Sequence, residues 1–152
     1  MVVRRADITS PVARFLIKAL DAEVRTLYPE EDANHFRLDD EEVAPGRGAF
    51  VVATDDHEPV ACGAVRLIEP GTAEIKRMFV VPSARGRRIG AAVLTALEEE
   101  ARALGATRLV LETGDRLTAA VALYRRAGFT PIARFGEYVN TKHSLCLEKR
   151  LG

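Results

Sequence analysis

A predicted strand, a basic turn and a long helix follow one another without a break across residues 74–104, and this stretch constrains the fold most. The strand, expected over residues 75–81, is rich in β-branched and large apolar residues and stops before Pro82, which cannot donate a backbone hydrogen bond to a neighbouring strand. Apolar residues then recur every three or four positions, which predicts a helix from about Arg87 or Arg88. This helix should bury Ile89, Val93, Leu94, Leu97, Ala101 and Leu104 and turn Glu98, Glu99, Glu100 and Arg102 towards water.

The turn at residues 83–90 has the composition of an anion-binding site. It reads Ser-Ala-Arg-Gly-Arg-Arg-Ile-Gly and carries three guanidinium groups and two glycines. The first turn of a helix has unpaired backbone N–H groups and the positive end of the helix dipole, so a phosphate there meets donors already in place. Gly86 and Gly90 let a ligand approach the backbone closely, and arginines add charge-assisted bonds to phosphate oxygens. Taken alone, however, the same turn also fits a solvated basic helix start.

Length and charge limit the classes of protein. A chain of 152 residues without a Gly/Ser/Pro-rich linker suits one domain over residues 1–152. Twenty-two basic and twenty-two acidic residues leave no net charge, so the electrostatic pattern of a nucleic-acid-binding protein is missing. No apolar run approaches the ~20 residues that a membrane span needs. We therefore expect a soluble, cytoplasmic protein that binds neither nucleic acid nor membrane.

The two cysteines, Cys62 and Cys146, both lie in apolar, strand-like contexts. They show none of the short Cys/His spacings of a zinc site. We expect two buried thiols and no metal site.

A second amphipathic helix is predicted over Pro11–Leu27. Ser10 followed by Pro11 is a typical N-cap with proline at the first helical position. Asp21 and Arg25 lie four residues apart and can form an ion pair. The residues with helical spacing on its apolar face are Val12, Phe15, Leu16, Ala19, Leu20, Val24 and Leu27.

The remaining elements complete an α+β order. The predicted elements follow the order strand, helix, three strands, helix, strand, helix, two strands. This order predicts a mixed, mostly antiparallel sheet of about seven strands, with helices on both faces. A polar turn at residues 55–59 joins two of these strands into a hairpin. The additional expected elements are a strand near Val2 and Val3, strands over residues 48–54, 60–68, 108–112 and 129–133, the strand Ser144–Arg150, and a helix over Thr118–Arg126.

An acidic segment covers residues 30–42. Seven carboxylates there are opposed only by Arg37 and His35. A charge run of this kind is commonly a solvated face. The alternative is that it borders a pocket and attracts a cationic substrate.

Four segments together resemble the GNAT superfamily of N-acetyltransferases. Residues 85–90 resemble its acyl-coenzyme A signature, Q/R-x-x-G-x-G/A, and residues 74–80 resemble the strand that leads into it. Residues 123–129 resemble the second signature, L-Y-x-x-x-G-F, and residues 144–149 are similar to the last strand of a bacterial branch. Order and spacing agree from about Val2 to Leu151, so the resemblance implies the GNAT, or acyl-CoA N-acyltransferase, fold.

Two positions depart from this pattern. Arg88 stands where the signature has its first glycine, and an arginine fits there if residue 88 has ordinary helical φ and offers only its N–H. Leu117 stands seven residues before Tyr124, where many relatives carry Asn or Gln. No cofactor or helix-start role is therefore transferred to Leu117.

The resemblance implies transfer of an acetyl group from acetyl-coenzyme A, as co-substrate, to a primary amine by direct attack in a ternary complex. The pantetheine arm would pair with the strand backbone, and the pyrophosphate would lie on the basic turn. The residues implied in cofactor binding are Met78, Phe79, Val80, Arg85, Gly86, Arg87, Arg88, Ile89 and Gly90.

The implied chemistry needs two proton-transfer groups. A lysine-like ammonium has a pKa of about 10.4 and must lose a proton before it attacks; Glu74 is the first candidate for this base, with a water chain as the alternative. Strand alternation puts Glu74, Lys76, Met78 and Val80 on one face, so Lys76 could instead pair with Glu74 structurally. Tyr124 would supply a proton or hydrogen bond to the coenzyme A thiolate, or is simply a buried tyrosine.

Residues near the last strand are secondary candidates. Glu137 and Tyr138 could border the acceptor pocket, and His143 could relay a proton or be incidental. The acceptor, a small-molecule amine or a lysine or N-terminal amine, stays open, and homodimers are common among such proteins. The alternative function is a non-catalytic acyl-coenzyme A sensor or interaction module; a nucleotide-phosphate enzyme would need the P-loop pattern, which is missing.

Overall fold

The computed structural model describes residues 1–30 and 38–152, and within these ranges seven strands form one sheet in the order β1-β2-β3-β4-β5-β7-β6. All neighbouring strands are antiparallel except β4 and β5, so the predicted mixed α+β sheet with helices on both faces is confirmed. The strands are β1 (Val2–Arg5), β2 (Gly48–Asp55), β3 (Glu58–Glu69), β4 (Thr72–Val80), β5 (Arg108–Gly114), β6 (Thr130–Ile132) and β7 (Ser144–Arg150). The helices are α1 (Pro11–Leu27), α2 (Ile89–Ala103) and α3 (Thr118–Arg126), with 3₁₀ turns η2 (Asp40–Val43), η3 (Pro82–Ala84) and η4 (Gly136–Tyr138).

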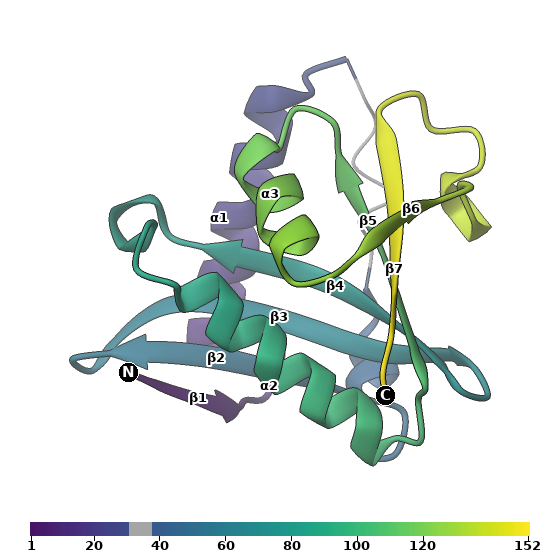
Figure 1. The fold of residues 1–152 in the computed structure, drawn as a ribbon. Helices are drawn as coiled ribbons and strands as arrows, with labels where there is room; N and C mark the ends of the chain where they lie inside the picture. The colour runs from purple at the N-terminus through teal and green to yellow at the C-terminus, as the bar shows by residue number, and fades with distance from the viewer. Residues whose placement is uncertain (31–37) are drawn as a thin grey trace.

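The sheet separates two hydrophobic cores (Figure 1). Helices α2 and α3 cover one face, where Val93, Leu97 and Tyr124 join the larger core. Helix α1 covers the other face, where Leu16 packs with residues of β2, β3 and β4. In the ranges 1–30 and 38–152, the structure contains no helix with the length and apolar character to cross a membrane.

Helix α1 has the predicted bounds and the predicted cap. The Ser10 Oγ accepts a hydrogen bond from the Ala13 N–H at 3.2 Å. The predicted apolar face is wrong at its N-terminal end, because Val12 is 42% and Phe15 59% exposed. A single helix on a sheet contacts it along a narrow stripe, and here that stripe contains Leu16.

Strand β4 contains a bulge that changes which side chains share a face. Arg77 has φ +59°, the register of β3 and β4 shifts between Cys62 and Ala64, and the Cys62 Sγ donates to the Arg77 carbonyl at 3.3 Å. As a result Met78 and Val80 pack on the same core as Ile75. The prediction that Met78 and Val80 share a face with Glu74 and Lys76 is wrong, since it assumed unbroken alternation.

Strands β4 and β5 diverge. They pair from Thr72 with Arg108 to Ile75 with Leu111, and within the described chain this pairing stops there although both strands continue. None of the strands in residues 1–30 and 38–152 therefore pairs with the edge of β4 from Lys76 to Val80 on the β5 side. A notch opens in the middle of the sheet.

Helix α2 contains one buried carboxylate. Glu98 was expected to face water, but it is 9% exposed and its Oε1 accepts a hydrogen bond from Lys149 Nζ at 2.6 Å. Lys149 comes from β7, so helical periodicity could not reveal the contact. Glu99 and Arg102, which were also expected to face water, are exposed.

The acidic segment is only partly described, because residues 31–37, which include His35 and Arg37, lie outside the described ranges. In the rest, Asp39 and Glu42 form a capping box for η2. Glu42 also accepts a hydrogen bond from Arg66 on β3. At this end the segment is therefore an ion-paired cap on the sheet and not a fully solvated face.

Candidate active site

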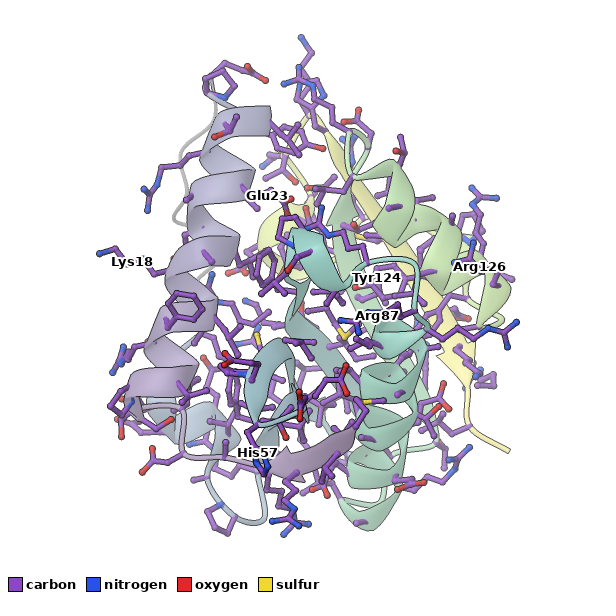
Figure 2. All side chains as sticks on the ribbon, turned by 90° about the vertical axis from the view of Figure 1, so that its left-hand side faces the viewer. Lys18, Glu23, His57, Arg87, Tyr124 and Arg126 are labelled. Carbon is purple, nitrogen blue, oxygen red and sulfur yellow. The ribbon has the colours of Figure 1, made fainter. Side chains whose placement is uncertain are left out.

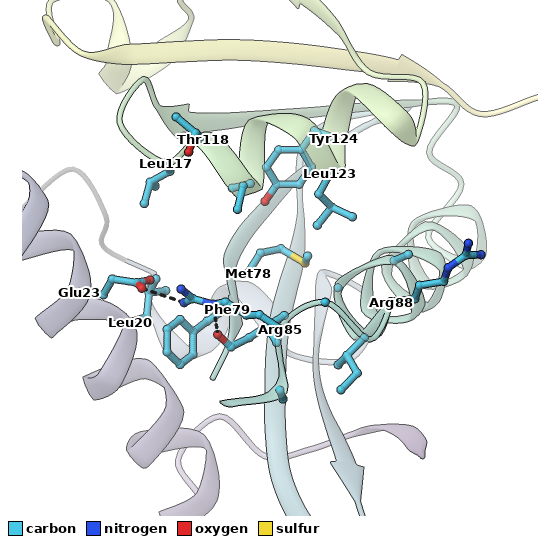
Figure 3. Close-up of a pocket in the computed structure, with 18 of the residues that line it drawn as sticks. Leu20, Glu23, Met78, Phe79, Arg85, Arg88, Leu117, Thr118, Leu123 and Tyr124 are labelled. Carbon is cyan, nitrogen blue, oxygen red and sulfur yellow. Dashed lines mark hydrogen bonds and ion pairs between the residues drawn. The ribbon is translucent and has the colours of Figure 1, made fainter. Parts of the chain in front are cut away.

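A cleft of about 770 Å³ opens at the notch between β4 and β5 (Figure 3). Met78, Phe79 and Val80 form its floor, and the basic turn with the start of α2 forms one end. Its other walls come from α3, the turn before α3 and α1; they are Leu20, Glu23, Leu27, Arg116, Leu117, Thr118, Ala119, Ala120, Leu123, Tyr124, Arg126 and Ala127. Figure 2 shows that Lys18 extends outwards from α1, whereas Glu23 lies on the side of α1 towards Tyr124.

A smaller cavity of about 80 Å³ adjoins the cleft deeper in the notch. The two share Met78, Leu117 and Tyr124, and the smaller one reaches Lys76 on β4 and Tyr138 in η4. Tyr124 thus stands at the junction of the two spaces. This junction is where the free edge of β4 meets side chains from α3 and from the segment before β7.

Tyr124 is placed by its ring and leaves its hydroxyl available. The ring is 5% exposed and packs edge-to-face on Phe129, with 5.8 Å between ring centroids. Burial, with a smaller effect of the Glu112 charge, raises the pKa of Tyr124 well above its usual value, so the hydroxyl keeps its proton at neutral pH. Among the described residues the hydroxyl has no hydrogen-bond partner, and Figure 3 shows it directed towards Met78. The predicted proton donor therefore lies where the cleft and the cavity join.

The basic turn brings most, but not all, of its predicted binding residues to the cleft. Arg85, Gly86, Arg88, Ile89 and Gly90 border it. Arg87 does not border the cleft, because its guanidinium pairs with Asp55 of β2 at 2.9 Å.

Arg88 has a left-handed backbone, with φ +61° and ψ +19°, at the position just before α2. The expectation of an ordinary helical φ at this residue is wrong. The left-handed conformation costs a residue with a side chain about 1–2 kcal/mol, and glycine is the residue that adopts it freely. This is a physical reason for the glycine of the signature, and Figure 3 shows the Arg88 guanidinium directed away from Tyr124.

Arg85 bridges the mouth of the cleft. Its Nη2 donates to Glu23 Oε1 on α1 at 2.8 Å, and its Nε donates to the Val80 carbonyl at 3.0 Å (Figure 3). The guanidinium also lies 5.8 Å from the centroid of the Phe79 ring. Arg85 thus links α1 to β4, because it pairs with the Glu23 carboxylate on α1 and donates to the Val80 carbonyl on the free edge of β4.

Glu74, the predicted base, lies in a buried network behind the cavity. It is 1% exposed, and its Oε1 accepts from Arg66 Nε at 3.1 Å and Nη2 at 2.8 Å. Its Oε2 accepts from the Tyr138 hydroxyl at 2.7 Å. Lys76 Nζ instead pairs with Glu137 at 3.2 Å, so the suggested Lys76–Glu74 pair is replaced by Arg66–Glu74. Glu74 borders neither the cleft nor the cavity.

The remaining candidates separate clearly. Tyr138 borders the small cavity, whereas Glu137 and His143 border neither space. The His143 Nδ1 lies 3.1 Å from Asp115 Oδ2, and its ring lies 5.8 Å from that of Tyr28, so it belongs to a polar cluster outside the cleft. Among residues 1–30 and 38–152, no group of three or more His, Cys, Asp or Glu side chains is arranged to hold a metal ion.

The sequence did not single out several residues that line these spaces. On α1 these are Leu20, Asp21 and Glu23, whose spacing says only that α1 is amphipathic. Asp21 pairs with Arg77 at 2.7 Å and not with Arg25 as predicted, because the bulge turns Arg77 towards α1. Leu117 occupies the N-cap position of α3 and borders both spaces. The one sequence signal that could have placed it at the site was its position seven residues before Tyr124.

Comparison with protein families decides the assignment. The family model "Acetyltransferase (GNAT) family" matches residues 14–129, which contain the notch, the basic turn and Tyr124. The chain belongs to the GNAT family of acetyltransferases. The resemblance read from the four segments is confirmed.

Relatives of this GNAT chain cover almost its whole length. It is 44% identical over 137 residues to "IAA acetyltransferase" of Azospirillum brasilense, and the matched region covers 90% of this chain and 88% of that protein. A solved structure from Klebsiella pneumoniae is 33% identical and has a TM-score of 0.86, and the match covers 99% of this chain and 97% of the other. A GNAT family acetyltransferase from Elizabethkingia anophelis, solved with acetyl-CoA bound, shares the fold at a TM-score of 0.69 and 19% identity, over 99% and 97% of the two chains.

The two cysteines of this GNAT protein are buried and free, as predicted. Burial raises the pKa of the Cys62 thiol to about 12 and also raises the pKa of Cys146. Since the thiolate is the reactive form, both should react slowly with Ellman's reagent at pH 8 in the native protein and fully after denaturation in urea. Rapid reaction of either thiol in the native state would contradict this expectation. Slow reaction also means that the reagent can report released coenzyme A.

Proposed function

We propose that residues 1–152 act as one domain that transfers an acetyl group from acetyl-coenzyme A to a primary amine, by direct attack of the amine on the thioester while both are bound. The observation that carries the proposal is the neutral Tyr124 hydroxyl at the junction of cleft and cavity, which has no hydrogen-bond partner among residues 1–30 and 38–152. A buried proton donor at the inner end of a ligand cleft suits a leaving thiolate.

The cleft has the features that a long, anionic cofactor needs. The free edge of β4 at Met78–Val80 offers backbone groups with which pantetheine amides can pair as a neighbouring strand would. The basic turn offers the N-terminus of α2 and Arg85 to the pyrophosphate. Acetyl-CoA bound in a relative of the same fold supports this choice of co-substrate.

The chemistry can then be written with all protons accounted for. The deprotonated amine forms a bond to the thioester carbonyl carbon, and a backbone N–H on the free edge of β4 stabilises the oxyanion. The carbon–sulfur bond breaks, and Tyr124 donates its proton to the sulfur. Tyr124 recovers a proton from the positively charged nitrogen of the attacking amine, which thereby becomes the neutral amide nitrogen, so the tyrosine is unchanged after each turnover.

The test is thiol release from acetyl-coenzyme A in the presence of three amine probes, namely spermidine, tryptamine and a lysine-containing peptide. Transfer predicts that thiol release depends on the amine and that the product is an amide, identified by mass spectrometry. Binding of coenzyme A without thiol release for any probe would contradict the proposal. That result would favour the non-catalytic acyl-coenzyme A sensor.

Glu23 is expected to weaken cofactor binding, because its carboxylate competes with the pyrophosphate for Arg85. Replacing it in Glu23→Gln should tighten the Kd of coenzyme A about two- to fivefold, in line with the modest energy of a partly exposed ion pair. Calorimetric titration at low salt measures this, and the gain should shrink as salt screens the charges. Glu99→Gln, an exposed position on α2, is the matched control. An unchanged or weaker Kd for Glu23→Gln would show that the pair does not oppose binding.

A further inference from the structure

Three side chains from three separate segments form a continuous hydrogen-bonded chain. Arg66 on β3 holds Oε1 of Glu74 on β4 through two hydrogen bonds, and Tyr138 in η4 donates to Oε2 at 2.7 Å. Glu74 is 1% and Tyr138 2% exposed, so water does not compete freely for these bonds. Arg66, with 18% of its side chain exposed, is the outer end of this chain, and Tyr138 is the end that borders the small cavity.

The end of this chain, and not its middle, reaches the cavity. Tyr138 borders the cavity, as does Tyr124, whereas Glu74 does not. Both oxygens of Glu74 are already occupied by Arg66 and Tyr138. The Tyr138 hydroxyl therefore forms a hydrogen-bonded link between the Glu74 carboxylate and the cavity.

The charges around Tyr138 decide how its hydroxyl can act. Burial, then the Glu74, Glu112 and Glu137 charges, raise the pKa of Tyr138 far above its usual value. The hydroxyl therefore stays protonated and cannot serve as a base by itself. Glu112, which also borders the cavity, accepts from the Ser144 hydroxyl at 2.5 Å, and Glu137 pairs with Lys76 at 3.2 Å. The Tyr138 hydroxyl itself donates to Glu74 Oε2, so Glu74 is the acceptor placed to take the Tyr138 proton.

Arg66 has a carboxylate partner besides Glu74. It is shared by two carboxylates, those of Glu74 and Glu42. A proton on Glu74 would therefore leave Arg66 paired with Glu42 and not as a buried cation without a counter-ion.

We propose that Tyr138 relays the acceptor's proton to Glu74, with Glu74 and Arg66 as positioning residues. This inference rests on the proposed acetyl transfer to an amine. One ammonium N–H proton passes to the Tyr138 oxygen while the Tyr138 hydroxyl proton passes to Glu74 Oε2. The amine becomes a neutral nucleophile, Tyr138 remains a phenol, and neutral Glu74 returns its proton to water by the reverse route after the amide leaves.

The test is the pH dependence of Tyr138→Phe, with saturating acetyl-coenzyme A and the fastest of the three amine probes. Phenylalanine keeps the ring contact with Phe135 and removes only the hydroxyl. We expect kcat at pH 7 to fall about tenfold or more with an unchanged KM for acetyl-coenzyme A. The deficit should close as pH rises towards about 10, where solution supplies the free amine.

Tyr28→Phe is the matched control. Tyr28 is also buried, and its hydroxyl bonds to Asp115 and to the Arg116 N–H, but it borders neither space. A purely structural role for Tyr138 predicts a deficit of the same size at every pH, as for any loosened loop. That result, or wild-type kcat at pH 7, would overturn the relay.

Glu74→Gln provides an independent second variant. The relay predicts the same pH-dependent deficit, and a double variant no slower than the worse single one, because both changes break one path. Thermal unfolding and coenzyme A binding establish that each variant is folded. If Glu74→Gln does not fold, the result for Tyr138→Phe alone decides the test. Wild-type protein that binds coenzyme A but acetylates none of the three amines would overturn the proposed function itself; an active wild type with a pH-independent deficit would overturn the relay alone.

Discussion

Tyr124→Phe is expected to lower kcat for acetyl transfer about 100-fold, the lower end of what a positioned acid contributes. The Phe ring keeps the edge-to-face contact with Phe129, so the walls of the cleft are preserved. Only the hydroxyl at the inner end of the cleft is lost. Affinity for acetyl-coenzyme A should therefore change little, because the pyrophosphate and pantetheine contacts lie elsewhere in the cleft.

Steady-state kinetics with separate titrations of acetyl-coenzyme A and amine measure this split between kcat and KM. Because the pKa of Tyr124 is raised by burial, the hydroxyl stays protonated across the assay range. The wild-type rate should consequently show no decline at pH 8–9 from ionisation of this tyrosine. Tyr28→Phe again serves as the control, and wild-type turnover in Tyr124→Phe would remove Tyr124 from the role.

Arg66→Met should cause the largest loss of stability. The change leaves Glu74, at 1% exposure, without its cation and also removes a partner of Glu42. Breaking a buried pair by removing one member costs about 3–5 kcal/mol. For a chain of this length that lowers the melting temperature by on the order of 10 °C. Arg5→Met is the control, because its pair with Glu100 lies on the surface and should contribute less than about 1 kcal/mol.

The stability deficit of Arg66→Met should depend on pH in a defined direction. Partial burial raises the pKa of Glu42, but hydrogen bonds from the Asp39 N–H and Arg66 outweigh it and hold that pKa below its usual value. A carboxylate of this kind stabilises the fold above its unfolded pKa of about 4.3, and the stabilisation is lost as pH falls through the lower folded value. The gap between wild type and variant should be widest at neutral pH and narrower in acid. Urea unfolding at pH 7 and pH 4 measures it, and an equal gap at both would contradict the assigned pairing.

Local sequence signals predicted the elements that depend on local chemistry. Helix α1 with its Ser10 cap, helix α3 and strand β7 have the predicted bounds. Capping, helical spacing and alternation are all properties of neighbouring residues. The anion-binding turn was recognisable for the same reason, since its arginines and glycines adjoin a helix start.

The errors in the predicted site come from contacts between distant segments. The bulge at Arg77 reverses the faces of β4, so Met78 leaves the side that holds Glu74, and strand alternation could not show this. Strand position alone likewise could not show that Glu74, the predicted base, is enclosed by Arg66 and Tyr138 from other segments. Periodicity likewise could not show that Glu23 on α1 would meet Arg85 across the mouth of the cleft.

The divergence of β4 and β5 should make the stability of the folded protein depend on how much acetyl-coenzyme A is available. Sheet proteins avoid unpaired strand edges because such edges template pairing with other chains. Here the unpaired edge of β4 lies inside the sheet, and a cofactor that pairs with it would close it. A ligand that binds only the folded state adds about 2.7 kcal/mol of stability at one hundred times its Kd. The supply of acetyl-coenzyme A would therefore set how much of this protein persists as well as how fast it works.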